Sequence, residues 1–458
     1  RSFRQLRAGA GVEGDVGALH ARAFALAYDG VFESPGVLRL DDLQSGEVGF
    51  YDAYDGSGGG RSSRALGGVE LVGTGVHSVS RVTLWGSLRR LSLEQNFTGF
   101  NVHPEQGDGS LQIQRAATMG LEASSSREVS SDIAVRAGLS ARADFIDQRE
   151  QGIDTQGFVW EDRYAAKATQ SATALWTQAE LRPTRWLTVA PGLRAEVFTA
   201  WVDRKESSPT TSWAPVLAPK LRTTWFGEER VSLFASYGRG YRSPEARALG
   251  DSPRAPLSVA DAGEVGLIAE LTPALSARSA VFLTRIDNEL LFDHVAARFL
   301  TTGTTRRMGV DAGLTLRPVE HVRLEGQITL SDARYTTTGA RIPFAPPVLG
   351  VVGLYTERLP LGSAELTAGV RGWVLGPRPL PGGFVSAPTG TADLSANLDW
   401  ERIGLSLDFD NAVGAKWRDG EFLFASRWDA DQPSSELPTR HITAGSAPTL
   451  RIGVQYRF

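Results

Sequence analysis

The sequence predicts an all-β protein, a transmembrane antiparallel β-barrel with about 19 strands in this chain. Three observations lead to this fold class. Apolar and polar residues alternate in one segment after another, the connections between these segments are alternately short and long, and no apolar run is as long as a membrane helix. The longest stretch without Asp, Glu, Lys or Arg covers the 15 residues of 342–356 and includes three prolines. A transmembrane helix needs about 20 apolar residues, so helical spans are excluded.

The alternation is clearest at the C-terminus, where Leu450, Ile452, Val454 and Tyr456 share one face and polar residues or glycine occupy the other. Successive side chains of a strand point to opposite faces, so a period of two indicates a strand with one apolar and one polar face. Applied to the whole chain, this pattern predicts strands at residues 3–12, 17–27, 63–73, 80–94, 112–124, 130–144, 165–181, 186–200, 217–226, 231–241, 260–271, 275–288, 304–317, 321–335, 347–357, 363–374, 389–400, 403–412 and 447–458.

The connections between these strands differ at the two ends of the expected barrel. A soluble sandwich or propeller has no reason to alternate short turns with long loops. An outer-membrane barrel has short periplasmic turns, long extracellular loops, an apolar exterior and a polar lumen. We therefore expect Phe458 to end at the short-turn rim and the long connections, which include 28–62, 145–164, 242–259 and 413–446, to face outside.

The two faces also predict roles for charged and aromatic residues. Arginines on the polar face should line the lumen in a structural network with nearby acids; Arg194, Arg323, Arg371, Arg451 and Arg457 are the examples. Tryptophans on the apolar face should belong to the aromatic girdles at the membrane interfaces. We assign Trp85, Trp176, Trp186, Trp225 and Trp400 to them.

Composition excludes several functional classes. The net charge of −4 provides no field to hold nucleic acid, and the chain has no cysteine for a disulfide, thiolate metal site or nucleophile. The six histidines are dispersed, and no HExxH spacing or serine with glycine at both −2 and +2 occurs. We therefore expect neither enzymatic activity nor a bound cofactor or metal.

Several segments resemble one family. Residues 236–245, SYGRGYRSPE, are similar to the family's "GFRAP" stretch, and 287–290 with 305–311 to its "kdxI … GxE" pair, although Asp311 replaces the usual Glu. Prolines at 343, 346 and 347 then open a strand, and residues 408–411 occupy the place of the family's "NLFD". In this order the segments resemble the TonB-dependent outer-membrane receptors over essentially the whole chain.

The resemblance implies a place in the bacterial outer membrane and energised uptake of a scarce nutrient, such as an iron chelate, a cobalamin-like cofactor or a glycan. In this family 22 strands surround a plug. An odd count of 19 makes segments 3–12 and 447–458 run in the same direction, so we expect residues 1–458 to form one barrel domain that is N-terminally incomplete. Three strands and the plug would then come from a second polypeptide or an upstream segment. The expected partners are that plug, the TonB complex acting through it, the barrel assembly machinery, and lipopolysaccharide and lipids.

Candidate ligand-binding residues are the aromatic and basic residues near the expected outer rim, which could stack on a ligand or pair with its charge. These are Phe158, Trp160, Arg239, Tyr241, Arg242, His294 and Arg298. The terminal aromatics Tyr456 and Phe458 resemble the signal that the assembly machinery reads. Two alternatives to energised uptake stay open: a passive porin, and a structural or assembly scaffold that has lost transport.

Overall fold

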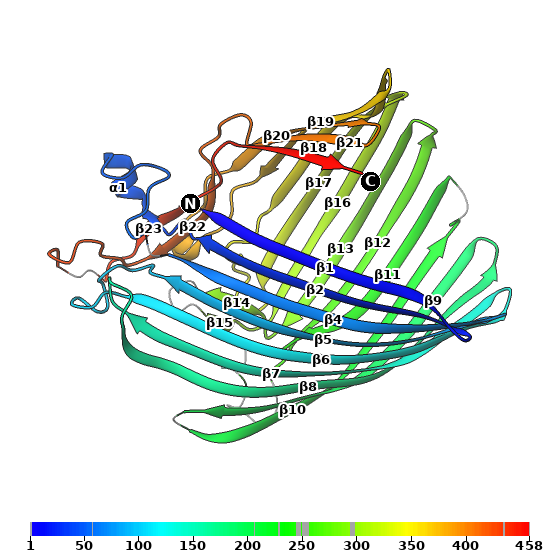
Figure 1. Ribbon diagram of the computed structural model, residues 1–458, viewed down its shortest axis with the longest axis horizontal. Coiled ribbons are helices and arrows are strands. Elements are labelled where there is room, and N and C mark those ends of the chain that lie inside the picture. Colours follow the sequence, from blue (N-terminus) through cyan, green and yellow to red (C-terminus); the bar gives the residue numbers. More distant parts are fainter. Residues whose placement is uncertain are drawn as a thin grey trace.

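The computed structural model describes residues 2–56, 58–205, 207–227, 230–243, 249, 256–293, 298–433 and 436–457, without the side chains of 292–293 and 298–301. Within these ranges 19 strands form a single curved antiparallel sheet in which each strand pairs with the next along the chain (Figure 1). The predicted fold class and strand number are confirmed. The strands are β1 (Phe3–Val16), β2 (Leu19–Glu33), β4 (Gly59–Gly75), β5 (Ser78–Gln95), β6 (Gly109–Ser130), β7 (Ile133–Ile153), β8 (Val159–Thr184), β9 (Leu187–Arg204), β10 (Ser207–Trp225), β11 (Val231–Arg242), β12 (Ser258–Thr272), β13 (Leu275–Asp287), β16 (Thr305–Val319), β17 (Val322–Tyr335), β18 (Val348–Leu361), β19 (Ala364–Leu375), β20 (Thr389–Trp400), β21 (Ile403–Asp410) and β24 (Thr449–Tyr456).

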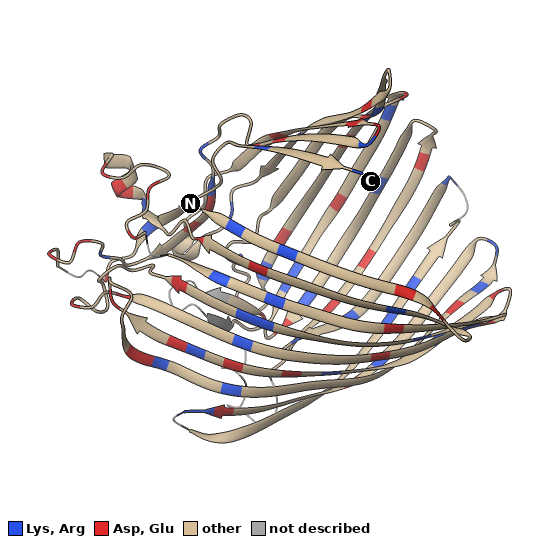
Figure 2. Cartoon of the chain, viewed as in Figure 1, with Lys and Arg blue, Asp and Glu red and all other residues tan. Residues whose placement is uncertain are grey.

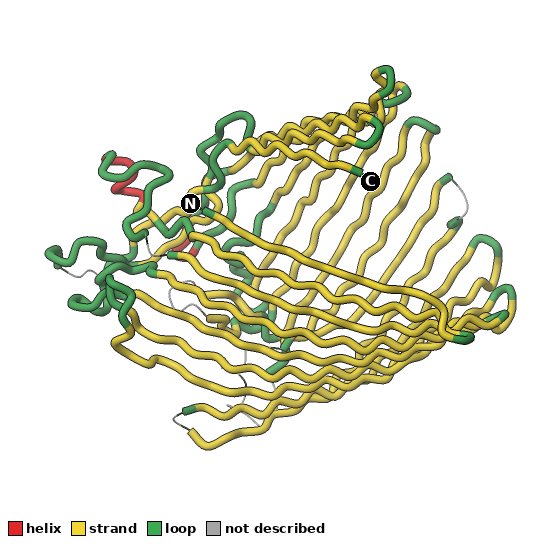
Figure 3. The backbone as a smooth tube through the Cα atoms, viewed as in Figure 1, coloured by secondary structure: helices red, strands yellow, loops and turns green. Residues whose placement is uncertain are grey.

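The remaining elements lie in the connections at one end of the sheet. They are β3 (Leu38–Arg39), α1 (Leu40–Ser45), β14 (Leu290–Asp293), β15 (Arg298–Thr301), the 3-10 turn η2 (Pro381–Gly383), β22 (Arg418–Phe424) and β23 (Thr439–Ala444). Among the described residues no helix is long and apolar enough to cross a membrane. Figure 3 shows long loops gathered at this end and short turns at the other.

Both chain ends lie where the alternation places them. The amide of Arg457 donates to the carbonyl of Arg402 (2.8 Å), which belongs to a short turn, so β24 ends at the short-turn side. The amide of Glu33 donates to the carbonyl of Ser2 (3.0 Å), so β1 begins at the long-loop side. In the described part of the chain β1 pairs with β2 alone and β24 with β21 alone, which leaves one edge of each without a ladder partner.

Some predicted loops are strands. Residues 145–153 continue β7 and 159–164 begin β8, while β9 extends to Arg204 and β10 already begins at Ser207. The prediction of a long loop over 145–164 was therefore wrong, and so was the gap left between the predicted strands 186–200 and 217–226. The antiparallel ladder satisfies the backbone whatever the side chains are, so pairing continues past the point where the apolar alternation ends.

The cross-strand register separates two faces of the sheet. On the outward face, Val69, Leu84, Leu121 and Ala141 lie opposite one another in a row, and Leu84 is 59% exposed. On the lumen face, arginines pair with acids as expected: Arg194 with Glu196 (2.5 Å), Arg371 with Asp393 (3.1 Å), Arg323 with Glu325 and Glu357, Arg451 with Asp410 and Arg457 with Asp399 (2.5 Å).

Two of the tryptophans assigned to the outward girdles face the lumen. Trp85 follows outward-facing Leu84 and its ring lies over Gly120 of the next strand; the ring of Trp176 lies over Gly138 in the same way. The assignment of these two tryptophans to the girdles was therefore wrong. Each ring packs on a glycine of the neighbouring strand, so its apolar surface is covered at the lumen face without contact with lipid. Trp225 and Trp400 keep to the outward face, opposite Leu233 and Ile403.

Candidate functional site

The long connections interlock at one end of the sheet. We call this assembly the outer cap; it comprises the described residues within 34–58, 96–108, 336–347, 376–388 and 411–448. Its framework is a three-stranded sheet in which β23 pairs with β22 on one side and with β3 on the other. Leu38, Leu40 and Ile442 form a small buried core beneath α1. The first and last long loops of the chain thus fold together as one unit.

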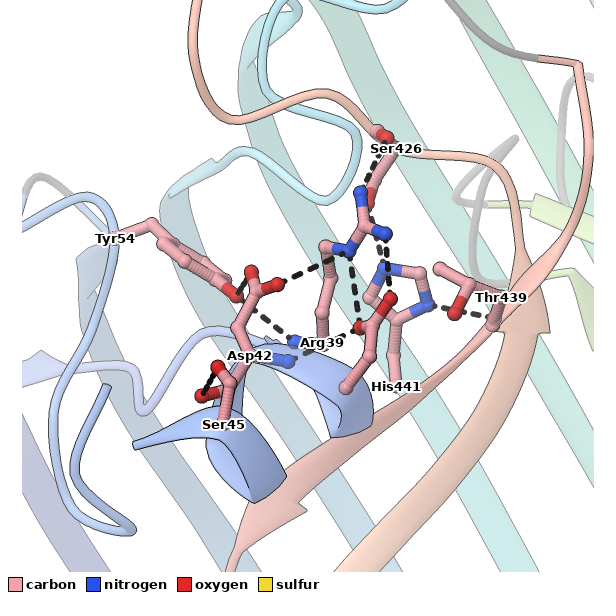
Figure 4. A network of polar contacts seen from close by, with 8 residues as sticks. Arg39, Asp42, Ser45, Tyr54, Ser426, Thr439 and His441 are labelled. Carbon is pink, nitrogen blue, oxygen red and sulfur yellow. Dashed lines mark hydrogen bonds and ion pairs between the residues drawn. The ribbon is translucent and has the colours of Figure 1, made fainter. Parts of the chain in front are cut away.

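Polar contacts also join the first and last long loops of the chain (Figure 4). The Arg39 guanidinium lies 2.6 Å from the Asp41 carboxylate and holds the pKa of that carboxyl below its usual value. The Tyr54 hydroxyl donates to Asp42, and burial together with this hydrogen bond raises the pKa of Tyr54. The Tyr54 ring also stacks on Trp428 with centroids 4.6 Å apart. Residues about 370 positions apart in sequence are therefore packed against each other.

His441 is fully buried at the centre of the cap. Its ring stacks on Phe424 (3.8 Å), its Nδ1 lies 3.0 Å from the Thr439 carbonyl, and its Nε2 lies 2.7 Å from the Ser426 hydroxyl. Because a carbonyl can only accept, Nδ1–H is the donor and Nε2 accepts from Ser426, which is the neutral tautomer. Burial lowers the pKa of His441 to about 4, so the ring is uncharged near neutral pH.

Glu421 joins three parts of the cap. Its carboxylate is 1% exposed and accepts hydrogen bonds from the Ala387 amide (2.8 Å), Arg418 (3.1 Å) and Arg440 (2.7 Å). These donors belong to the β19–β20 loop, β22 and β23 respectively. A buried carboxylate needs such partners, because an unpaired charge is very costly to remove from water. The charge of Glu421 is therefore used to hold the loops together.

The loop 96–108 is organised around another buried carboxylate. Asp108 accepts hydrogen bonds from the Thr98 hydroxyl (2.6 Å) and the amides of Asn101 (2.9 Å) and His103 (2.7 Å). The loop is tied to the last long connection by backbone bonds, since the Phe100 amide donates to the Arg427 carbonyl (2.7 Å). Loop 96–108 is therefore joined to the last long connection as part of the cap.

A hollow of about 1060 Å³ lies between the cap and the lumen face of β13 and β16–β18; we call it the vestibule. Its aromatic lining is Phe97, Phe282, Phe344 and Phe422. Its polar lining includes Thr329, Ser331, Asp419 and two arginines. Arg307 pairs with Glu289, whereas the Arg378 guanidinium donates only to the carbonyl of Asp419 (3.3 and 3.4 Å) within the described part of the chain. Such a lining suits a ligand with flat apolar groups and negative charge.

The family follows from comparison with known proteins. Residues 19–433 match the family described as "TonB dependent receptor-like, beta-barrel". The chain belongs to the TonB-dependent receptors. No curated protein matches its sequence.

Solved structures of receptors share the fold. The ferric yersiniabactin uptake receptor FyuA of Yersinia pestis aligns with 100% of this chain and 71% of its own, at 13% identity and a TM-score of 0.77. The unliganded ferric citrate transporter FecA aligns with 99% and 70% at 15% identity (TM-score 0.78), and the siderophore receptor PiuA of Acinetobacter baumannii with 99% and 74% at 12% identity (TM-score 0.74).

The predicted rim residues of this TonB-dependent receptor lie in two separate places, and neither group lines the vestibule. Trp160 packs against the His103 ring (4.9 Å), with Phe158 exposed beside it at the β7–β8 loop. On β11, Arg239 forms two hydrogen bonds with Asp261 (2.8 and 2.9 Å), the Tyr241 hydroxyl donates to Glu196, and Arg242 is the last residue of the strand. His294, the Arg298 side chain and Phe458 lie outside the described residues, and Tyr456 faces outward at the foot of β24.

Sequence reasoning missed the vestibule residues of this TonB-dependent receptor. Phe97, Phe344, Phe422 and Arg378 come from four different connections, and only folding of the cap brings them together. The prolines at 343, 346 and 347 were a signal, because they fix an irregular segment, and this segment lines the vestibule. Nothing local marks Phe422 or Arg378.

Proposed function

We propose that this chain is the wall and ligand-capturing part of an integral outer-membrane receptor that takes up a scarce iron chelate with energy delivered through TonB. The vestibule carries the proposal, because a hollow lined by interlocking loops on one side and by the lumen face of the wall on the other is where a solute would be held before passage. The similar structures support the cargo class, since they include a ferric yersiniabactin uptake receptor, a ferric citrate transporter and a siderophore receptor.

The lining of the vestibule favours an anionic chelate with aromatic groups. Four phenylalanine rings offer stacking surfaces, and Arg378 offers a guanidinium that, among the described residues, donates to a backbone carbonyl and to no carboxylate. A cobalamin-like cofactor or a glycan would use the same stacking surfaces with less demand for positive charge. The proposal includes no enzymatic step and no resident cofactor.

Energised uptake also needs parts that the family supplies. A plug domain would fill the lumen and carry the contact with TonB, and the barrel assembly machinery would insert the wall. The paired arginines and acids of the lumen face, such as Arg371 with Asp393, would serve as the polar surface against which the plug rests. A second polypeptide that completes the sheet would act in the same way.

Uptake of radioactive iron tests the proposal. Cells without other iron receptors would express the full-length receptor and be given ferric citrate, a ferric catecholate or a ferric hydroxamate, with and without TonB. We expect one chelate class to be taken up only when TonB is present. Phe422→Ala should weaken its binding about tenfold, whereas Phe384→Ala, a cap phenylalanine outside the vestibule lining, should leave binding unchanged.

Other results would select the alternatives. Passage of small solutes in both strains, without saturation, would indicate a passive porin. No passage of any probe in either strain, with the protein folded in the outer membrane, would indicate a structural scaffold. Binding of cobalamin or an oligosaccharide in place of the chelates would keep the receptor and change its cargo.

A further inference from the structure

Two neighbouring strands of the wall, β10 and β11, separate in its outer half. Toward the long loops β10 stays paired with β9, and β11 stays paired with β12. Among the described residues, however, the ladder between β10 and β11 joins only Lys220–Trp225 to Leu233–Gly238. Beyond this point both strands continue without pairing with each other. We call this unpaired stretch, residues 207–219 of β10 beside 239–242 of β11, the seam.

The sequence of β10 explains why the ladder stops. The amide of Phe226 donates to the carbonyl of Trp186 at the foot of β9 (2.7 Å), and the register with β9 is unbroken from there up to Thr210. Hydrogen bonds alternate in direction along a strand, so even-numbered residues of β10 bond to β9 and odd-numbered ones point toward β11. Pro215 and Pro219 are both odd-numbered. A proline has no N–H, so each removes a donor on the side that faces β11.

The seam lies at the height of the lipid hydrocarbon. Trp213 shares the outward face with Trp225 and is 54% exposed. The strand between these two tryptophans covers roughly 40 Å, which at a tilt of about 40° gives about 30 Å of height, slightly more than the apolar band of an outer-membrane barrel. The tryptophans therefore mark the two membrane interfaces, and 213–219 lies in the upper half of the band. Charged residues are spread over the strands of the wall in Figure 2, but residues 207–219 include none.

A hollow of about 660 Å³ lies in the seam and reaches both faces of the wall. Four consecutive residues of β10, 214–217, line it. Successive side chains point to opposite faces, so the hollow lies against the free edge of the strand. Ala214, Val216 and Leu257 line this hollow and also belong to a buried apolar cluster on the lumen face. Apolar surface is therefore continuous from the lipid side of the wall to the lumen side.

The side chain of Tyr241 crosses the seam. Odd-numbered residues of β11 face outward, as Leu233 does opposite Trp225. Tyr241 is odd-numbered, yet its hydroxyl donates to Glu196, whose carboxylate lies on the lumen face and is held by Arg194 (2.5 Å). The Tyr241 side chain must therefore pass between β10 and β11, where it joins the two edges that no backbone ladder joins within the described residues.

We propose that the seam is a lateral gate through which the alkyl chain of an amphipathic molecule passes between the outer leaflet and the lumen. The hydrogen bond from Tyr241 to Glu196 keeps the gate closed, and its release lets the edges of β10 and β11 move apart. The occupant follows from the chemistry of the hollow. A strand from another chain cannot add to β10, because Pro215 and Pro219 lack the N–H groups that a ladder needs. A polar solute would lose its hydration against the apolar lining.

This inference goes beyond the proposed function. It requires the receptor to lie in the outer membrane, but it does not require the receptor to take up iron. A receptor that failed every uptake assay would still admit an alkyl chain at the seam.

The two strands offer a matched pair of disulfide locks. Extending the β10–β11 register beyond its last pair would bring Ala218 opposite Gly240, whereas Arg222 already lies opposite Ser236. Both pairs consist of even-numbered residues, so both have the non-hydrogen-bonded geometry that brings side chains closest. A Cβ added to Gly240 would meet no atom within 4 Å, and this chain has no cysteine of its own. Ala218→Cys/Gly240→Cys would therefore tie the seam shut, and Arg222→Cys/Ser236→Cys is the control lock in the paired part.

The test uses the full-length receptor in lipid vesicles and a fatty acid that carries a photoactivatable diazirine at the end of its chain. Peptide mass spectrometry locates the labelled residues. We expect labelling of lumen-face residues beside the hollow, such as Phe198 and Val216. The oxidised seam lock should reduce this labelling about tenfold or more, with recovery on reduction, and the control lock should leave it unchanged. Tyr241→Phe should raise it about tenfold, because a hydrogen bond to a charged group is lost.

Three results would overturn the proposal. Labelling confined to outward-face residues of the unlocked receptor would show that the chain does not pass the wall. Lumen-face labelling that survived the seam lock would show that the chain enters elsewhere. Disulfide formation at equal rates in the two cysteine pairs would show that β10 and β11 are paired throughout. If Tyr241→Phe does not fold, the two locks decide between these outcomes, and none of the readouts depends on iron uptake.

Discussion

The wall and the outer cap of this receptor are held together in opposite ways. In the wall, each strand pairs with the next along the chain through long uninterrupted ladders, such as the pairing of β5 with β6 from Ser78–Arg127 to Gln95–Ser110. In the cap, contacts join distant segments: Thr443 donates to the carbonyl of Gly36 across 407 positions. The wall therefore depends on many equivalent local pairings, whereas the cap depends on a few buried polar groups. Single substitutions should separate the two.

The largest effect should follow from removing the buried carboxylate of the cap. Glu421→Ala leaves Arg418 and Arg440 without their shared partner and the Ala387 amide without its acceptor. Breaking a buried ion pair costs about 3–5 kcal/mol, and we expect this cost to appear as local opening of the cap. Limited proteolysis should cut within 411–448, with the wall intact. Glu47→Ala, an exposed acid of the cap, is the control, and equal protection of both variants would show that Glu421 does not hold the loops.

The wall should respond to the face that is changed and not to the charge itself. Leu84→Arg places a cation in the apolar band and should cost about 2–4 kcal/mol in lipid. Ser87→Arg, three residues away on the same strand, places the same cation on the lumen face and should cost little. Folding equilibria in lipid vesicles measure both. Equal costs would mean that the two faces of β5 do not differ in their exposure to lipid.

The cap should also lose stability in mild acid, while the wall should not. His441 has an unfolded pKa of about 6.5 and a folded pKa of about 4, so the unfolded form binds the extra proton between these values. The contribution of His441 is therefore complete above pH 6.5, falls as the pH drops to about 4, and amounts to about 3 kcal/mol at most. Hydrogen exchange of β22 and β23 would follow the loss. His441→Gln should flatten the pH dependence in this window, and an unchanged profile would exclude His441 as its cause.

This contrast also explains what the sequence could predict. Strand positions, the two ends of the sheet and most lumen ion pairs depend on residues two positions apart or on neighbouring strands, and a period of two reveals them. Trp85 and Trp176 were assigned to the wrong face because the glycines beneath them, Gly120 and Gly138, lie on other strands. The vestibule could not be predicted for the same reason. Its lining residues Phe97 and Phe422 are more than 300 residues apart in the chain and line the same hollow only once the cap has folded. Local sequence patterns cannot reveal such long-range contacts.

The measurement that tests the account most directly is the side of the membrane on which the cap lies. The chain has no cysteine, so a single introduced one can be followed without interference. Leu437→Cys lies in the cap at a position that is 80% exposed, and Val76→Cys lies in a short turn at one that is 92% exposed. A membrane-impermeant maleimide added to intact cells should label Leu437→Cys at once and Val76→Cys only after the outer membrane is opened. Labelling of Val76→Cys in sealed cells, with Leu437→Cys protected, would contradict the account, because the vestibule would then face away from any external ligand.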